Sequence, residues 1–440
     1  MTSRFVADTV LTCDADFQMH RPGAIDVDED GRIEWVGPAA EAPARDVRRE
    51  QNLDGILLPG LVNTHCHSPM TLFRGTGEDL VLNRWLKQVL WPREAHLTSQ
   101  DVYWGMTLAA GELLRFGVTT SCEMYYYSRA IVDAVVDAGA RVVVTPPVML
   151  ATGMEHLGTW QEQLAANESL VEPMADAHER VEVGLAAHAA YTLPLDALEG
   201  IGRSAAERDL LLQIHVAESR HEASALEREQ QRSVPQILTD MGFFDARRVL
   251  AAHSVWLSDA DLALYAENDV AVAHCPQSNT KLASGIARVT DMLDAGLRVG
   301  LGTDGPASNN DLDLWEEMRL APLLQRARTL DASVMPAPEA ICLATRGGAS
   351  ALGRSDIGVL EEGRWADLVR LETADTAFVP VTEDADLVSH LLWSASSRHV
   401  RDVWVAGRQV VGDGICLTVD ESRAREEVQR RAVRLAALGG

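Results

Sequence analysis

Eight short apolar runs, separated by amphipathic stretches, fill the middle of the chain, and this alternation restricts the fold more than any other feature. The runs cover residues 56–58, 118–121, 141–144, 181–186, 211–214, 249–252, 270–273 and 299–302. Stretches with helical periodicity, such as 101–116, lie between most of them. Eight strand–helix units over about 300 residues match the size of a (β/α)8, TIM-like barrel, which we predict for residues 58–357. A doubly wound sheet is the alternative, but no glycine-rich phosphate-binding turn follows the first run.

Strand-like segments also occur near both ends of the chain. At the start they cover residues 5–7, 24–27 and 33–36, with the turn pair Asp30-Gly31 between the last two. Near the end they cover 365–371 and 400–411, with Ala406-Gly407 as a turn. We therefore predict one small β-sandwich domain formed by residues 1–57 and 358–440. An arginine-rich amphipathic helix over 421–438 completes the second part.

The charge balance excludes some classes of partner. The formal net charge is −26, from 39 basic and 65 acidic residues, and such a surface repels phosphate backbones. We therefore expect a small-molecule substrate and no nucleic acid. No apolar run reaches the length of about 18 residues that a membrane span needs, so we expect no membrane partner. The start lacks a signal-peptide pattern, and the six cysteines form no CxxC pair, which favours the cytoplasm and no disulfide framework.

Titratable side chains follow four of the apolar runs. They are His65 and His67 after the first run, His215 and Glu218 at the fifth, His253 at the sixth and Asp304 at the eighth. Side chains at the carboxyl ends of barrel strands point into the active site. Two histidines two positions apart on an extended segment face the same side and can reach one ion. The placement therefore predicts a metal site; structural or solvated histidines are the alternative for any one of these positions taken alone.

Several motifs carry a family resemblance that covers nearly the whole chain. They are PGLVNTHCH at 59–67, MTLFRG at 70–75, AHCP at 273–276, SNTKLASGI at 278–286 and GTDG at 302–305. With His215, Glu218 and His253, these motifs resemble the amidohydrolase superfamily. More narrowly the chain is similar to the S-adenosylhomocysteine/5′-methylthioadenosine deaminases of the ATZ/TRZ-like group. The resemblance implies a barrel with a small β-domain from both termini, in agreement with the pattern of runs.

The resemblance also implies a set of roles. His65, His67, His215 and Asp304 are expected to ligate a divalent metal, while Glu218, His253 and Asp304 are expected to be catalytic. Zinc is the ion we expect, although Fe²⁺ and Mn²⁺ accept the same ligands. Members with two metals bridge them through a carboxylated lysine, usually on strand four. Here the fourth run leads to His188, and the only lysines are Lys87 and Lys281, so we expect one ion per chain.

The activity implied is hydrolytic deamination, with release of ammonia from the cyclic amidine of an aminated purine. Trp85, Glu94 and His188 resemble the set by which adenosine-type deaminases recognise nucleosides. Trp85 would pack against the ligand, and Glu94 and His188 would bind the ribose hydroxyls. Packing or solvated roles are the alternative for Trp85 and Glu94, because both lie on a predicted helical excursion after the first strand. Homo-oligomers occur in the family, and no feature of this sequence decides the oligomeric state.

One departure from the resemblance concerns the 5′ substituent. Homocysteine-accepting members carry an arginine where Pro146 stands, and a second arginine in the stretch that is 151–161 here, which contains none. We therefore expect a neutral 5′ group, as in 5′-methylthioadenosine, 5′-deoxyadenosine or adenosine, in preference to S-adenosylhomocysteine. Met154 and His156 are candidates to line that end. Two alternatives stay open: hydrolysis of another aminated heterocycle (guanine, pterin or s-triazine), and a non-enzymatic binding protein on a degenerate barrel.

Overall fold

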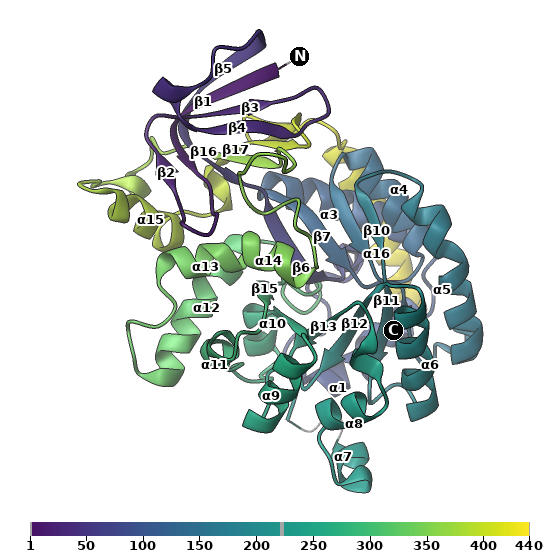
Figure 1. Ribbon diagram of the computed structural model, residues 1–440. Helices are drawn as coiled ribbons and strands as arrows, with labels where there is room; N and C mark the ends of the chain where they lie inside the picture. The colour runs from purple at the N-terminus through teal and green to yellow at the C-terminus, as the bar shows by residue number, and fades with distance from the viewer. Residues whose placement is uncertain (1, 221–223, 440) are drawn as a thin grey trace.

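The computed structural model describes residues 2–220 and 224–439 and contains the barrel that the sequence predicts (Figure 1). All of the strand pairs in the barrel are parallel. In barrel order its strands are β6 (Leu61–Cys66), β7 (Val118–Glu123), β8 (Arg141–Val144), the pair β10 (Val181–Val183) and β11 (Leu185–Ala189), β12 (Leu211–Val216), β13 (Arg248–His253), β14 (Ala271–His274) and β15 (Val299–Leu301). A short strand, β9 (Pro147–Val148), pairs with β11.

The fourth barrel strand is interrupted, and the ring closes between its last strand and its first. The interruption is at Gly184, whose N–H still donates to the carbonyl of Val144 on β8 at 2.9 Å. At the closure, the Thr64 hydroxyl of β6 donates to the carbonyl of Leu301 on β15 at 2.8 Å. The strands approach closely there because Gly300 has no side chain: a Cβ at this position would lie 2.4 Å from Cγ2 of Thr64. The first and last strands therefore hold their carboxyl ends side by side.

The first apolar run does not belong to the barrel, which corrects the expectation for residues 56–58. These residues end the long strand β5 (Val47–Pro59), which pairs with β1 (Thr2–Leu11) and β16 (Leu368–Leu371) in the terminal sheet. The first barrel strand is β6, and it begins after Gly60. A fully buried run has the same composition in either sheet, so periodicity could not assign it.

The terminal strands form a single nine-stranded sheet in the order β19-β18-β17-β16-β5-β1-β3-β4, with β2 beside β1. Its remaining strands are β2 (Met19–His20), β3 (Gly23–Val27), β4 (Ile33–Pro38), β17 (Val400–Val405), β18 (Arg408–Gly412) and β19 (Ile415–Cys416). Two strands separate β1 from β17, about 14 Å in a flat sheet. Yet the rings of Phe5 and Trp404 lie 5.3 Å apart, edge to face. The sheet therefore wraps around its own core, which agrees with the predicted sandwich from both termini.

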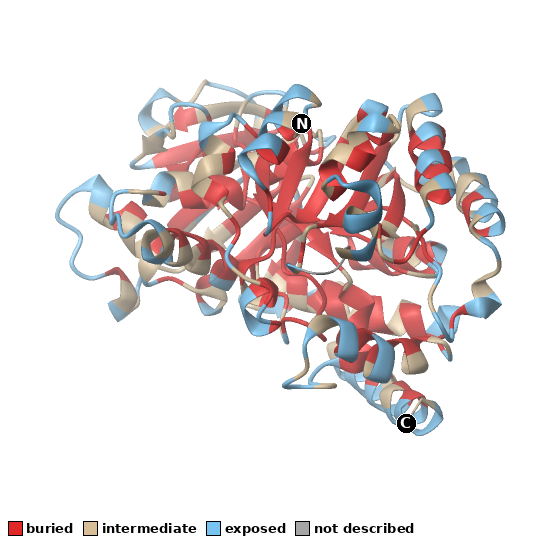
Figure 2. Cartoon of the chain, turned by 90° about the horizontal axis from the view of Figure 1, so that it is seen from below, coloured by how far each residue is buried: buried red, intermediate tan, exposed pale blue. Residues whose placement is uncertain are grey.

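Helices cover the outside of the barrel, and their outward faces carry exposed residues (Figure 2). The longer ones are α3 (Ser99–Arg115), α4 (Ser128–Ala138), α5 (Trp160–Ala175), α6 (Leu195–Glu207), α9 (Asp259–Glu267) and α12 (Leu314–Thr329). The helix predicted at the end of the chain is α16 (Glu421–Leu438). It packs against α3 of the barrel, where Arg431 and Arg434 form ion pairs with Asp101. No helix formed by the described residues is long and apolar enough to cross a membrane.

Two shorter helices lie between the last barrel strand and the terminal sheet, and a third lies between β16 and β17 of that sheet. They are α13 (Ala337–Leu343), α14 (Arg346–Ala351) and α15 (Asp384–Trp393). Helix α14 contacts both β15 and β6, so it braces the closure of the ring. The division of the chain at 1–57, 58–357 and 358–440 stays our proposal for its domains, with the sheet itself extending to Pro59.

Candidate active site

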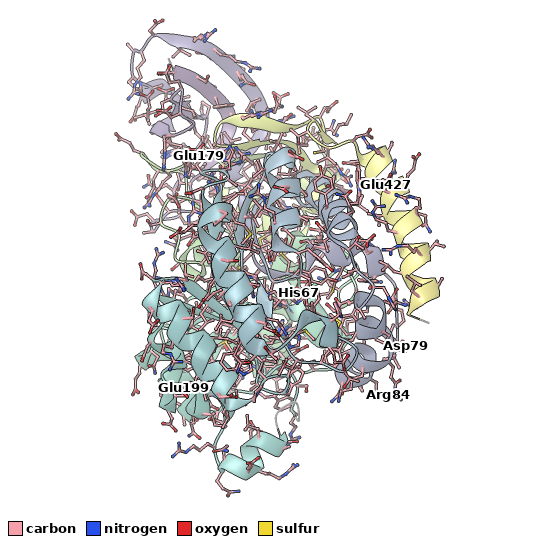
Figure 3. The ribbon with its side chains drawn as sticks, turned by 90° about the vertical axis from the view of Figure 1, so that its right-hand side faces the viewer. His67, Asp79, Arg84, Glu179, Glu199 and Glu427 are labelled. Carbon is pink, nitrogen blue, oxygen red and sulfur yellow. The ribbon has the colours of Figure 1, made fainter. Side chains whose placement is uncertain are left out.

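The side chains predicted to form the site converge at the carboxyl ends of the barrel strands. His65 lies on β6 and His67 directly after it, His215 lies on β12, His253 ends β13, and Asp304 follows β15. Figure 3 shows His67 in the interior of the molecule, whereas Glu199 and Glu427 lie on its outer helices. The parallel strands thus bring together residues that are far apart in the sequence.

The distances within this cluster suit a single cation. Nε2 of His67 lies 3.3 Å from Oδ1 of Asp304 and 3.3 Å from Nε2 of His215. Nε2 of His65 lies 3.7 Å from the same Oδ1. The candidate ligand atoms of His65, His67 and Asp304 all lie within 4.8 Å of one another, as do those of His65, His215 and His253.

The chemistry of the donor set also fits a metal ion. Nε2 of His65 is buried and has no hydrogen-bond partner among the described residues. Burial lowers the pKa of His65 to about 3, and burial lowers that of His215 well below its usual value. Neutral imidazoles beside an ionised carboxylate are the ligands that a divalent transition metal prefers, and a buried polar nitrogen without a partner is costly otherwise.

Backbone carbonyls orient two of the imidazoles. Nδ1 of His215 lies 2.7 Å from the carbonyl oxygen of His188, and Nδ1 of His67 lies 2.5 Å from that of Met124. A carbonyl can only accept, so each Nδ1 carries the proton and donates. Each Nε2 is then left with its lone pair directed into the cluster, which is the arrangement of metal-binding histidines.

Hydroxyl groups orient Asp304 in the same way. The hydroxyls of Ser278 and Ser308 donate to its Oδ2 at 2.6 and 2.9 Å. The N–H of Gly305 donates to Oδ1 at 2.8 Å, while that oxygen also faces the histidines. Burial would raise the pKa of Asp304, but the neighbouring histidines, His65 foremost, hold it well below its usual value. This carboxylate is therefore ionised and fixed in direction.

Glu218 and His253 lie beside the cluster and face each other. Oε2 of Glu218 is 3.8 Å from Nε2 of His253. Nδ1 of His253 donates to Oδ1 of Asn279 at 2.9 Å, so its Nε2 is the free acceptor. Burial, with a smaller contribution from the charge of Asp304, raises the pKa of Glu218 well above its usual value. Glu218 is therefore suited to carry a proton at neutral pH, and His253 is suited to accept one.

A cavity opens directly onto these groups. It is lined by His67, His215, Glu218, His253 and Asp304 on one side, and by Trp85, Glu94 and His188 among other residues. All three predicted substrate-binding residues thus share one cavity with the cluster. Among the residues that the structure describes, none of those lining it is a lysine or an arginine. Apart from its histidines, the described lining therefore offers no side chain that could carry a positive charge.

Of the residues expected to bind the sugar, Glu94 is buried and His188 is half-buried, and each has a hydrogen-bond partner. Glu94 ends α2 (Trp91–Glu94), and its Oε1 accepts a hydrogen bond from the Tyr125 hydroxyl at 2.6 Å. Burial raises the pKa of Glu94 to about 7. Nδ1 of His188 lies 3.0 Å from the Thr192 hydroxyl, and burial lowers its pKa to about 3. Trp85, in α1 (Leu82–Trp85), donates from Nε1 to the carbonyl of Thr76 at 3.0 Å.

The structure does not bring Met154 and His156 to this cavity. Met154 is buried and lines a separate surface cavity together with Glu155 and Glu162, and His156 is exposed. His156 belongs to the short helix η4 (Glu155–Leu157), and Met154 is the residue directly before this helix. The expectation that these two residues line the catalytic pocket is therefore wrong.

Several residues of the site were not singled out in the sequence. The cavity wall includes Tyr125, Tyr126 and Tyr191, and the supporting groups include Gln213, whose side-chain amide lies 2.9 Å from Nδ1 of His65. Tyr125 and Tyr126 stand two and three residues after β7, so their position close to a strand end could have identified them. Ser278 and Asn279 stand in a motif that was noted only as part of the family resemblance.

Comparison with known proteins identifies the family. The family model described as "Amidohydrolase family" matches residues 56–410, which is most of the chain. The chain belongs to the amidohydrolase family. The resemblance seen in the sequence is thereby confirmed.

Three relatives show how closely this amidohydrolase follows known members. It is 38% identical over 433 residues to the 5-methylthioadenosine/S-adenosylhomocysteine deaminase of Pelotomaculum thermopropionicum, covering 97% of each chain. The structure of an adenosine deaminase from Xanthomonas campestris with bound zinc has a TM-score of 0.93 and 31% identity, covering 99% of this chain and 98% of that one. The structure of an atrazine chlorohydrolase from Arthrobacter aurescens TC1 complexed with zinc has a TM-score of 0.87 and 25% identity, covering 97% and 100%.

Proposed function

We propose that this amidohydrolase is a metal-dependent hydrolytic deaminase of adenosine-type nucleosides. The observation that carries the proposal is that Glu94 and His188, which complement a pair of ribose hydroxyls, line the same cavity as Glu218 and the histidine–aspartate cluster. The names of the deaminase relatives support the same reaction class. Small molecules of this kind would be the substrate.

One divalent ion per chain, with zinc as the proposed metal, would be held by His65, His67, His215 and Asp304. When bound, the ion would act as a Lewis acid and make a water molecule acidic enough to react near neutral pH. A single ion is favoured because Lys87 lies in η3 (Leu86–Leu90) and Lys281 in α10 (Pro276–Lys281), so strand four offers no lysine to bridge two metals.

The proposed mechanism assigns one proton movement to each catalytic side chain. His253 accepts a proton from the attacking water at Nε2, the ring nitrogen that Asn279 leaves free. Glu218 donates its proton to the ring nitrogen next to the carbon that carries the amino group. Asp304 helps to transfer the second proton of that water to the departing amino group, and the proton held by His253 returns to Glu218, which lies 3.8 Å away. The carbon gains an oxygen from water, its bond to nitrogen breaks, and ammonia leaves.

The charges around the cavity favour a substrate with a neutral 5′ group. A homocysteine carboxylate would need a cation, and the described lining of the cavity includes none. The segment that continues from Pro147, in the cavity wall, leads to the separate surface cavity, which is lined by the acidic residues Glu155 and Glu162. We therefore propose 5′-methylthioadenosine, 5′-deoxyadenosine or adenosine in preference to S-adenosylhomocysteine.

A comparison of kcat/KM tests this function directly. Ammonia release is measured with 5′-methylthioadenosine, 5′-deoxyadenosine, adenosine, S-adenosylhomocysteine and adenine. We expect the three neutral nucleosides to be the best substrates. Adenine should be poorer by several orders of magnitude, because a site built around hydroxyls rejects ligands that lack them.

Two results would contradict parts of the proposal. A clear preference for S-adenosylhomocysteine would show that another group binds its carboxylate, and only the 5′ assignment would fail. Activity on guanine, a pterin or an s-triazine, without activity on any adenine nucleoside, would overturn the roles of Glu94 and His188 and leave only the hydrolytic chemistry.

A further inference from the structure

Tyr125 links Glu94, the proposed ribose acceptor, to the end of strand β7. It stands two residues after β7, its ring lies in the cavity wall, and its side chain is 2% exposed. Its hydroxyl donates to Oε1 of Glu94 at 2.6 Å, and Glu94 is itself 3% exposed. A hydrogen bond between two groups this deeply buried constrains both of them.

Because of this hydrogen bond, the two carboxylate oxygens of Glu94 have different roles. Because Oε1 accepts from the phenol, Oε2 is the oxygen left to accept from a substrate. A hydrogen bond to a carboxylate favours its charged form, which is the stronger acceptor. Burial raises the pKa of Glu94, and the hydrogen bond from the Tyr125 phenol opposes this protonation. Without it, the carboxylate would be both free to rotate and more readily protonated.

Met124, the residue before Tyr125, is also held by a hydrogen bond to the site. The carbonyl of Met124, the preceding residue, is the acceptor for Nδ1 of His67. The ring of Tyr125 also lies 6.3 Å from the ring of His67, centre to centre. One short segment therefore fixes a proposed metal ligand through Met124 and the proposed ribose acceptor through Tyr125. This links the position of the sugar to the position of the reacting carbon.

We propose that Tyr125 is a positioning residue for sugar recognition: its hydroxyl holds Glu94 in the orientation that accepts a hydrogen bond from a ribose hydroxyl of the substrate. The inference rests on the proposed function, because it presumes a nucleoside in the cavity. It assigns to Tyr125 no contact with the reacting atoms.

The test compares two substrates that differ only in the hydroxyls at issue. For the Tyr125→Phe enzyme, kcat and KM are measured with adenosine and with 2′,3′-dideoxyadenosine, and metal content is measured on the same sample. We expect kcat/KM for adenosine to fall about 10- to 100-fold, mainly through KM, as expected for a lost hydrogen bond to a charged group. The value for 2′,3′-dideoxyadenosine should change less than about twofold, and metal content should not change.

Two further variants separate positioning from general damage. Tyr103→Phe removes a matched phenol–carboxylate bond, since Tyr103 donates to Asp137 at 2.8 Å on the helical surface. It should leave the ratio of kcat/KM for the two substrates unchanged. In a Glu94→Ala background, adding Tyr125→Phe should leave that ratio unchanged as well, because the group that Tyr125 positions is already absent.

The outcomes distinguish this inference from the proposed function. If the wild-type enzyme prefers adenosine but Tyr125→Phe lowers kcat/KM equally for both substrates, or lowers neither, the role of Tyr125 is overturned and the proposed function stands. If Tyr125→Phe still changes the ratio in the Glu94→Ala background, Tyr125 acts on the sugar by another route and the inference fails. If the wild-type enzyme deaminates neither nucleoside, the proposed function fails and this role fails with it.

Discussion

At the scale of single residues, the metal cluster depends on one atom from each side chain. Replacing His67 by alanine removes the Nε2 that lies 3.3 Å from both Asp304 and His215. We expect the purified wild-type protein to hold about one transition-metal ion per chain, and His67→Ala to lose metal and activity together. Elemental analysis and an ammonia-release assay measure both quantities, and a chelator should abolish the wild-type activity.

A matched histidine change serves as the control for that prediction. His156 is exposed on a loop outside the cavity, so His156→Ala should keep both metal and activity. Two tightly bound ions per wild-type chain would contradict the argument from Lys87 and Lys281.

Glu218 is predicted to act on protons and not on the metal. Glu218→Gln keeps the shape and volume of the side chain but removes the acid, so kcat should fall about 10²- to 10⁴-fold. Metal content should stay at the wild-type level, because the carboxylate is absent from the proposed ligand set. Full activity in a variant that retains its metal would show that another group supplies the proton.

Glu94 should make the stability of the protein depend on pH. Burial raises its pKa from 4.5 to about 7, so its contribution to stability is complete below about pH 4.5 and is lost as the pH rises through about 7. Glu94→Gln stays neutral and can still accept from Tyr125. Its advantage in stability over the wild type should therefore be larger at pH 8 than at pH 5, by roughly 2 kcal/mol.

Melting temperatures of both proteins at the two pH values measure this difference. An advantage of equal size at pH 5 and pH 8 would mean that Glu94 titrates at its ordinary pKa in the folded state. The same variant should lose activity toward adenosine, because an amide is a weaker acceptor for a ribose hydroxyl than a carboxylate.

At the scale of secondary structure elements, the closure between β15 and β6 determines whether the ligands meet. His65 and His67 extend from β6 and Asp304 from β15, and Gly300 permits the two strands to approach. In Gly300→Ala, the new methyl group would lie 2.4 Å from Cγ2 of Thr64 and 2.8 Å from the Cα of Gly348. We expect a loss of about 1–3 kcal/mol in stability and weaker metal retention, because the strands must move apart.

Thermal unfolding with and without a chelator measures both effects. The matched control is Gly111→Ala on α3, where the new Cβ would meet its nearest neighbours at an ordinary 3.4 Å and alanine favours the helix. If the two variants unfolded at the same temperature, the closure would be less tightly packed than the distances indicate.

At the scale of the whole molecule, the charge of the chain bears on its partners. A net charge of −26 repels polyanions, so long single-stranded DNA or RNA should not inhibit the enzyme. Activity assayed with and without such strands, at low and moderate salt, tests this. Tight binding that weakens with salt would show that the molecule carries a basic groove.

The sequence by itself determined the barrel, the terminal β-domain and the residues of the cluster. It could do so because a barrel gathers the carboxyl ends of its strands at one face, so a residue's place after a strand already fixes its neighbourhood. His65, His67, His215, His253 and Asp304 are therefore found together without knowledge of their coordinates. Glu94 and His188 were singled out through the family resemblance, and the structure places both in the same cavity.

Only the tertiary structure decided which distant groups pair. In the structure, residues 56–58 belong to the terminal sheet. That sheet curves so that the rings of Phe5 and Trp404 are in contact. The Tyr125 hydroxyl donates a hydrogen bond to Glu94. The tertiary structure also chose the carbonyls that set the protonated nitrogens of His67 and His215. Local patterns record burial and periodicity but not the identity of a partner. Partners are selected by packing between segments far apart in the chain, where shape and hydrogen bonding must be satisfied together.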